Sequence, residues 1–252
     1  MSGRFDGRPI LISGAGRGLG EGIAKHLAGE GAIVGVCDIN VDSAHAVVKA
    51  IRDAGGKAYA YGGDLGKRSE FFGVAEAFRY DAGRPLRGLI NNASVLVYEP
   101  IEKVTEDTLE RMISAGLKAV FWGTQAFLEH RDESAQGNIL NYSSPVAYRG
   151  RPGTGAYTAI KSAVAGLTMV LAGELGPRGI RVNAIAPGSV PTPATEGFVT
   201  AEQYEQRAKN IPLRRNGTPQ DVARAAAFIL SDEADFVNGA MLAIDGGIIA
   251  AG

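Results

Sequence analysis

A tyrosine and a lysine stand four residues apart, at Tyr157 and Lys161. They lie in a stretch whose apolar periodicity predicts a helix over about residues 155–175. At this spacing both side chains project from one face of the helix, one turn apart. A nearby ammonium favours the phenolate form of a tyrosine and lowers its pKa. The pair can therefore exchange a proton with a hydroxyl or carbonyl group.

Ser144 lies thirteen residues before Tyr157, at the end of a predicted strand within GNILNYSS. Its hydroxyl can donate a hydrogen bond to a substrate oxygen as charge develops there. Tyr157 would take a hydroxyl proton during oxidation and return it during reduction. Taken singly, Ser144, Tyr157 and Lys161 could equally be ordinary surface or turn residues.

A second group of residues with chemical potential follows the first predicted strand, PILIS, and opens directly into a predicted helix. Glycines permit a tight turn there and let backbone N–H groups approach a pyrophosphate at the positive end of the helix. Within a strand–turn–helix unit this pattern indicates a dinucleotide site. The expected contacts in this turn are Ser13, Gly14, Arg17, Gly18, Leu19 and Gly20.

Asp38 ends the second predicted strand, about twenty residues beyond the glycines. A carboxylate there accepts hydrogen bonds from the adenosine ribose of NAD and repels the 2′-phosphate of NADP. Arg17 is the opposing signal, because its guanidinium could pair with that phosphate. The short-range repulsion from Asp38 outweighs an arginine that can turn into solvent, so NAD is the predicted cofactor and NADP the alternative.

Two further strand ends carry candidate cofactor contacts. Asp64 and Leu65 follow the third strand, where Asp64 either accepts a bond from the adenine amino group or caps the next helix. Asn92 and Ala93 follow the fourth strand, and the amides of Asn91 and Asn92 could also tie neighbouring loops together.

Short apolar runs alternate with amphipathic stretches along the whole chain, which predicts a single α/β domain over residues 1–252. Strands are expected within PILIS, AIVGVCDI, KAYAYGGD, RGLINNAS, GNILNYSS, RVNAIAPGS and AMLAIDGG. Helices are expected from Leu19, over 41–54, 69–79, about 106–130, about 155–175 and 220–230. The proline-containing, polar segment at about 188–210 breaks this rhythm and is expected to be a substrate loop.

Composition narrows the possible partners. The net charge is −1, with 26 basic and 27 acidic residues spread along the chain, so neither nucleic acid nor an anionic membrane is an expected partner. The single cysteine and three scattered histidines predict no disulfide framework and no metal site. The N-terminus lacks the apolar run of a signal peptide, so a cytoplasmic location is expected.

Six ordered motifs resemble the short-chain dehydrogenase/reductase family: Ser13 to Gly20, Asn91 to Ser94, Ser144, Tyr157 to Lys161, Pro187-Gly188 with Thr192, and Asp245 to Gly247. The resemblance implies a doubly wound Rossmann fold with about seven parallel strands and helices on both faces. It also implies a nicotinamide cofactor and a homodimer or homotetramer. In the family, Lys161 would hold the nicotinamide ribose, and Pro187, Gly188, Val190 and Thr192 would line the nicotinamide side.

The sequence departs from the family pattern at two positions. Gly116 stands where the family has an asparagine that helps hold a water of the proton relay, and Ser94 stands where it has a glycine. Either water or substrate fills the space at Gly116 and the relay runs through the backbone, or proton exchange is impaired. If the second holds, replacing Gly116 with asparagine should raise turnover.

The function predicted from these residues is hydride transfer between the cofactor and a small secondary alcohol or ketone. Val95, Leu96 and Val146 are expected to line an apolar pocket for an uncharged substrate. Arg149 and Arg151 could instead meet an anionic group or simply be solvated. The alternatives are an NADPH-dependent 3-oxoacyl-(acyl-carrier-protein) reductase and a nucleotide-binding protein with weak catalysis. A surplus of apolar residues on two long helices predicts a partner subunit, namely Val120, Phe121, Trp122, Phe127, Val164, Leu167 and Leu171.

Overall fold

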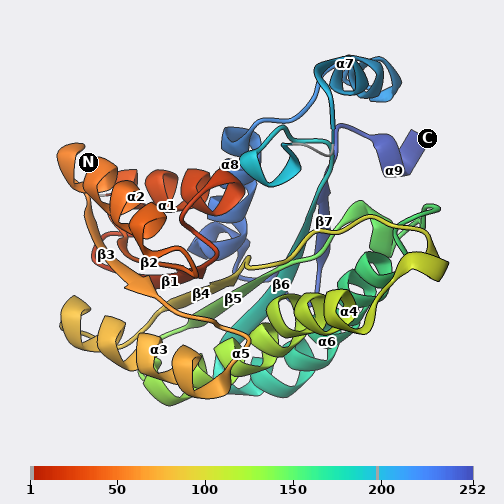
Figure 1. The fold of residues 1–252 in the computed structure, drawn as a ribbon. Coiled ribbons are helices and arrows are strands. Elements are labelled where there is room, and N and C mark those ends of the chain that lie inside the picture. The colour runs from red at the N-terminus through yellow and green to blue at the C-terminus, as the bar shows by residue number, and fades with distance from the viewer. Residues whose placement is uncertain (1–2, 197–198, 252) are drawn as a thin grey trace.

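The computed structural model describes residues 3–196 and 199–251. Within them, seven parallel strands form one sheet in the order β3-β2-β1-β4-β5-β6-β7 (Figure 1). Every predicted strand is present: β1 (Pro9–Ser13), β2 (Ile33–Asp38), β3 (Lys57–Gly62), β4 (Gly88–Asn91), β5 (Gly137–Tyr142), β6 (Ile180–Pro187) and β7 (Met241–Ile244). The described helices are α1 (Gly18–Gly29), α2 (Val41–Asp53), α3 (Arg68–Ala82), α4 (Glu106–Ile113), α5 (Ala119–His130), α6 (Gly155–Leu175), α7 (Ala201–Asn210), α8 (Pro219–Leu230) and α9 (Ile248–Ala251).

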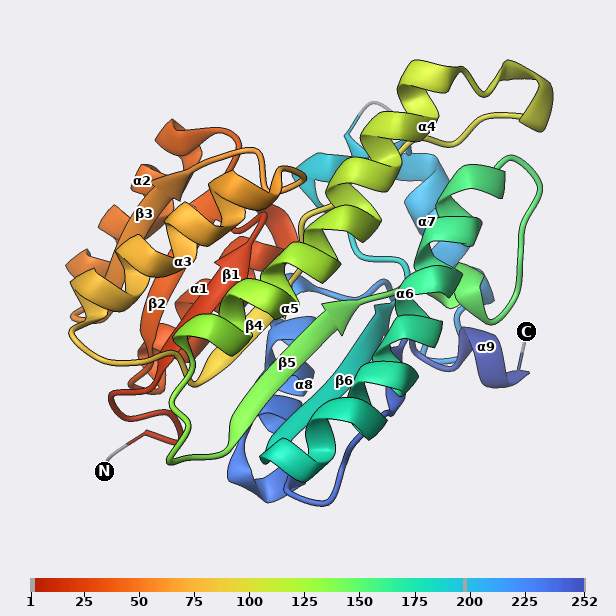
Figure 2. The same cartoon turned by 90° about the horizontal axis from the view of Figure 1, so that it is seen from below.

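Helices cover both faces of the sheet. Figure 1 shows α1, α2 and α8 on one face and α3, α5 and α6 on the other, and Figure 2 shows the second set in front of the strands. Each face has its own apolar core. Because both faces are covered, every residue of β1 is buried, as expected for a strand in a parallel sheet. The predicted doubly wound fold is confirmed.

The chain reverses direction across the sheet between β1 and β4. From β1 it builds outward through β2 to β3, and then it returns to place β4 on the other side of β1. The loops after β1 and β4 therefore diverge and leave a crevice at the carboxyl ends of the strands, where open α/β sheets bind their ligands.

The helix predicted over residues 106–130 contains one π-helical turn. Residues 114–118 form this turn between α4 and α5, and the N–H of Ala119 donates to the carbonyl of Ser114, five residues back. Gly116 lies in the turn and is buried. Single π-turns inside α-helices occur frequently at functional sites.

The sequence predicted a loop at about 188–210, but part of this segment is helical. Thr200 and Gln203 form a reciprocal capping box that starts α7, which ends at Asn210. None of its residues is buried, so the helix has no apolar face that a sequence pattern could reveal. Residues 197 and 198 lie outside the described part of the chain.

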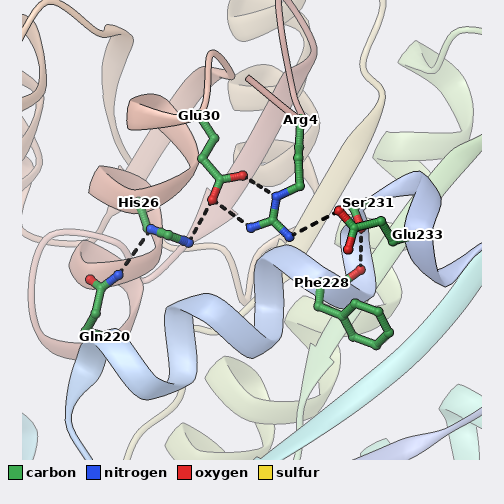
Figure 3. A network of polar contacts seen from close by, with 7 residues as sticks. All are labelled: Arg4, His26, Glu30, Gln220, Phe228, Ser231 and Glu233. Atoms are coloured by element: carbon green, nitrogen blue, oxygen red, sulfur yellow. Dashed lines mark hydrogen bonds and ion pairs between the residues drawn. The ribbon is translucent and has the colours of Figure 1, made fainter. Parts of the chain in front are cut away.

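A polar network fastens α1 to α8 (Figure 3). Arg4 donates two hydrogen bonds to Glu30, at 2.6 and 2.7 Å, and a ring nitrogen of His26 lies 3.1 Å from the same carboxylate. The other ring nitrogen lies 3.2 Å from the Gln220 amide on α8. These contacts hold the helix that follows the glycine-rich turn.

Residues Gly155–Arg178 are long and apolar enough to cross a membrane by length and composition alone. In this fold they form α6 and the turn after it. Ile160, Lys161, Val164 and Thr168 are buried there, and α6 packs against β5 and β6. The buried apolar residues of α6 thus pack against the sheet.

Candidate active site

A cavity of about 1120 Å³ opens at the carboxyl ends of the central strands. It joins the glycine-rich turn to the residues that follow β5 and to the face of α6. All but two of the predicted site residues line it: Gly14, Arg17, Gly18, Leu19, Asp38, Asp64, Leu65, Asn92, Ala93, Ser144, Tyr157, Lys161, Pro187, Gly188, Val190 and Thr192. The fold therefore brings together predicted site residues that are spread over most of the chain.

Ser13 and Gly20 are the two predicted residues that do not line the cavity. The Ser13 hydroxyl is buried and accepts hydrogen bonds from the backbone N–H groups of Asn92 and Ala93, at 3.0 and 3.1 Å. The Asn92 amide in turn donates to the carbonyls of Ser13 and Gly14. Gly20 has no room for a side chain, because a Cβ there would lie 2.3 Å from the Gly14 carbonyl oxygen. Ser13 and Gly20 thus shape the crevice from behind.

The first turn of α1 fits a pyrophosphate. No side chain caps it, since Arg17 at the N-cap makes no capping hydrogen bond. Gly14 and Gly18 have φ values of +62°, which a side chain would disfavour, and both line the cavity. An uncapped helix N-terminus presents backbone N–H groups and the positive end of the helix dipole to an anion. The residues present therefore suit a dinucleotide.

The Asp38 carboxylate is held in place at the edge of this turn. One oxygen accepts from the Gly16 N–H and the other from the Asn40 N–H, both at 3.0 Å. Arg17 is exposed and, among the described residues, forms no ion pair. The Asp38 carboxylate is thus held in place at this end of the cavity, whereas the Arg17 guanidinium is not.

Asp64 does not cap the next helix, so that alternative was wrong. Helix α3 begins at Arg68, with Lys67 at its N-cap. The Asp64 carboxylate accepts instead from the Gly66 N–H at 3.1 Å. Asp64 also lines the cavity, so the predicted adenine contact stays a prediction.

Ser144, Tyr157 and Lys161 meet at the other end of the cavity. Ser144 follows β5 by two residues and lines the cavity together with Tyr157, whose pKa it acts to lower. Lys161 is almost fully buried on α6, with its Nζ 5.7 Å from the centre of the Tyr157 ring. The ammonium donates to the carbonyl of Tyr142 at 2.9 Å, and Ser143 donates to the Lys161 carbonyl at 2.9 Å. The end of β5 thereby fixes the catalytic face of α6.

The sequence predicted that Lys161 lowers the pKa of Tyr157, and this prediction was wrong. Burial raises the pKa of Tyr157 above its usual range, and the hydrogen bond with Ser144 acts in the opposite direction. Burial also lowers the pKa of Lys161 to about 8, because the low-polarity surroundings disfavour its charge. Desolvation is therefore the largest influence on the pKa of each group.

A protonated Tyr157 beside Ser144 is arranged to give a proton to a carbonyl oxygen. Both hydroxyls would hydrogen-bond that oxygen, so negative charge developing on it is stabilised. In the reverse direction Tyr157 must accept the proton of an alcohol. Because burial raises the Tyr157 pKa, oxidation of an alcohol should accelerate as the pH rises.

Sequence reasoning missed many of the residues that line the cavity, among them Tyr98 and Arg207. Tyr98 packs edge-on against Tyr157, with ring centres 5.6 Å apart and planes at 75°. Arg207 reaches the cavity from α7. Tyr98 lies in an irregular segment after β4, and α7 has no apolar periodicity, so neither carried a recognisable pattern.

The two departures from the family pattern face each other. A Cβ on Gly116 would lie 3.6 Å from the Ser94 hydroxyl and 2.9 Å from Cγ2 of the buried Ile160. The space beside Gly116 is therefore taken by Ile160, and an asparagine would fit only if Ile160 moved. Low activity of Gly116→Asn would then reflect the steric clash with Ile160 as well as any effect on proton exchange.

We expect Gly116→Ala to lower the free energy of unfolding by about 1 kcal/mol. Alanine gains up to about 1 kcal/mol of helix propensity, but overpacking a well-filled site costs about 1–3 kcal/mol. Chemical denaturation of Gly116→Ala alone and in an Ile160→Ala background measures the coupling. Gly73→Ala on α3, where nothing lies within 4 Å of the added Cβ, is the matched control and should stabilise. A loss of the same size in both backgrounds would show that Ile160 is not the cause.

Comparison with known proteins agrees with this site. A family model described as enoyl-(acyl carrier protein) reductase matches residues 14–249. The chain is 36% identical over 250 residues to cyclopentanol dehydrogenase from Comamonas sp. (strain NCIMB 9872), covering 98% of this chain and 99% of that protein. It is 35% identical over 246 residues to a 3-oxoacyl-(acyl-carrier-protein) reductase from Thermotoga maritima, covering 98% and 99%.

The fold is also that of solved relatives. A 7α-hydroxysteroid dehydrogenase complexed with NADH and 7-oxo glycochenodeoxycholic acid superposes with a TM-score of 0.92 at 34% identity, covering 97% of this chain and 95% of that one. Sequence and structure thus agree along nearly the whole chain. The chain belongs to the short-chain dehydrogenase/reductase family and is an NAD(P)-dependent oxidoreductase that acts on CH–OH groups.

Proposed function

We propose that this protein is an NAD-dependent dehydrogenase of small secondary alcohols, with Ser144, Tyr157 and Lys161 as its catalytic residues. The observation that carries this is one cavity with these three residues at one end and the fixed Asp38 carboxylate at the other. When bound, the nicotinamide ring supplies the hydride acceptor or donor. The cyclopentanol dehydrogenase relative supports a secondary alcohol as substrate.

The preference for NAD follows from the surroundings of Asp38. Its two backbone hydrogen bonds keep the carboxylate at the strand end, so a 2′-phosphate would meet a charge that cannot turn away. Gly14, Gly18, Leu19, Asp64, Leu65, Asn92 and Ala93 would hold the adenosine and pyrophosphate. Pro187, Gly188, Val190 and Thr192, with Tyr157 and Lys161, would hold the nicotinamide half.

Titration of the purified protein with NADH and NADPH tests the cofactor assignment. We expect NADH to bind at least about tenfold more tightly, which corresponds to about 1.4 kcal/mol. Asp38→Asn should reduce the preference for NADH over NADPH, because asparagine removes the negative charge and keeps the shape of the side chain. Asp42→Asn, in the first turn of α2 and outside the cavity, removes the same charge nearby and should leave the affinity ratio unchanged. Equal affinity in the unaltered protein would contradict the assignment.

A second candidate is an NADPH-dependent 3-oxoacyl-thioester reductase. The Thermotoga relative favours it, as does Arg17, which lines the cavity and could turn toward a 2′-phosphate. A turnover screen with secondary alcohols, simple ketones and a 3-oxoacyl thioester separates the two candidates. Preference for the thioester together with NADPH would replace the first proposal.

We further propose a homodimer or homotetramer located in the cytoplasm. Phe121 on α5 and Met169 and Val170 on α6 are 44%, 63% and 54% exposed, which supports a covered apolar surface. Of the residues that the sequence singled out for this role, Val120, Phe127 and Val164 are instead buried inside the protein. The balanced net charge of −1 gives no support to a nucleic acid partner. Light scattering of the purified protein reports the assembly.

A further inference from the structure

Besides Arg17, four arginines of the described chain line the cavity. Arg149 and Arg151 come from the segment after β5, Arg111 comes from α4, and Arg207 comes from α7. Arg111 lies 3.5 Å from Asp107 and is thus partly neutralised. Neither Arg151 nor Arg207 forms an ion pair within the described ranges 3–196 and 199–251. Among the described lining residues, five arginines and Lys161 stand against the carboxylates of Asp38, Asp64 and Glu99, so basic groups outnumber acidic ones.

Tyr98 connects these arginines to the catalytic residues. Its ring contacts the Tyr157 ring. Burial raises the pKa of Tyr98, and the charges of Arg207 and Arg151 act in the opposite direction. Tyr98, Arg151 and Arg207 line the same cavity, although the two arginines come from segments more than fifty residues apart.

Arg207 is carried by a positioned element. Its guanidinium lies 5.5 Å from the centre of the Tyr204 ring, one turn earlier on α7. The Tyr204 hydroxyl donates to Thr195 at 2.6 Å, and the Tyr204 carbonyl accepts from the Asn216 amide at 2.9 Å. These two hydrogen bonds hold α7 in place, and its half-buried Arg207 lines the cavity.

We propose that Arg151 and Arg207 bind an anionic group of the substrate on the far side of Tyr98 from Tyr157, so that the preferred substrates are secondary alcohols or ketones that also carry a carboxylate or similar anion. This proposal rests on the proposed function and names its substrate class. It replaces the uncharged substrate that Val95, Leu96 and Val146 suggested. Guanidinium groups bind carboxylates through paired, charge-assisted hydrogen bonds, and a site built for such a group discriminates against analogues that lack it.

A matched series of substrates tests the anion site. The acids are 3-hydroxybutanoate, 4-hydroxypentanoate and 5-hydroxyhexanoate, each compared with its methyl ester in NAD⁺-linked oxidation. The best acid should exceed its ester at least tenfold in kcat/KM. Arg151→Gln and Arg207→Gln should each lower that acid's kcat/KM about tenfold or more through KM, while the ester changes less than twofold. Arg79→Gln, on an exposed turn of α3 outside the cavity, is the control and should change neither.

Binding of pentanoate and pentanamide to the enzyme mixed with NADH, followed by calorimetry, gives a readout without turnover. Pentanoate should bind more tightly, and Arg207→Gln should abolish the difference. If no alcohol is oxidised but pentanoate still binds through the arginines, the proposed function fails and the anion site stands. If every ester equals or exceeds its acid, or if the arginine variants affect acid and ester alike, the anion site is wrong.

Discussion

Tyr157→Phe is expected to lower kcat/KM by about 10²- to 10⁴-fold in both directions, the range for loss of a general acid–base group. Phenylalanine keeps the ring that packs against Tyr98 and removes only the hydroxyl. NADH affinity should change little, because the pyrophosphate and adenosine contacts lie at the other end of the cavity. Initial rates with a secondary alcohol and the matching ketone, together with an NADH fluorescence titration, measure both effects.

The matched control is Tyr80→Phe on α3, where the tyrosine is 86% exposed and lies outside the cavity. It makes the same chemical change and should leave the rates unaltered. A Tyr157→Phe enzyme that retained more than about a tenth of the original kcat/KM would show that another group moves the proton.

Lys161→Met should abolish most activity without destabilising the fold at neutral pH. Burial lowers the pKa of Lys161 from 10.5 to about 8, so the charged form at pH 7 costs about 3 kcal/mol, at about 1.4 kcal/mol per unit. Methionine removes this cost but leaves the Tyr142 carbonyl without its partner, a loss of about 1–3 kcal/mol. The variant should therefore be equal to the unaltered protein in stability or up to about 2 kcal/mol more stable, while kcat/KM falls by about 10²-fold or more.

The direction in which this stability difference changes with pH identifies Lys161 as its source. Between pH 8 and 10.5 the unfolded chain holds the Lys161 proton and the folded protein does not, so raising the pH favours the folded form. The unaltered protein should gain about 2 kcal/mol relative to Lys161→Met between pH 7 and 9.5. Denaturant unfolding at several pH values measures this difference, with the exposed Lys57→Met as control. A constant difference across this range would mean that Lys161 is not desolvated.

The sequence was sufficient for the sheet because its central strands are short apolar runs buried on both faces. β1 and β2 are such runs, and their periodicity carries the signal without tertiary information. The glycine-rich turn and the spacing of Ser144, Tyr157 and Lys161 are local patterns of the same kind. These features could be read directly from the chain.

Other features depend on contacts between distant segments. The N-cap alternative for Asp64 was wrong because the chain turns at Gly66 and α3 begins only at Arg68. The Tyr157 pKa was misjudged because helical spacing gives the position of Lys161 but not the burial of either group. The convergence of Arg151 and Arg207 could not be predicted either, since α7 is polar throughout and resembles a loop in sequence.

The transfer of deuterium tests the central claim most directly. Cyclopentanol deuterated at its carbinol carbon would be incubated with the protein and NAD⁺, and the reduced cofactor examined by mass spectrometry and NMR. The proposed function requires that the deuterium appear at C4 of NADH on one face of the ring. The rate should be slower than for the unlabelled alcohol, and transfer by Tyr157→Phe should be at least about 10²-fold slower again. Turnover of secondary alcohols without label in NADH, or equal transfer by Tyr157→Phe, would contradict it.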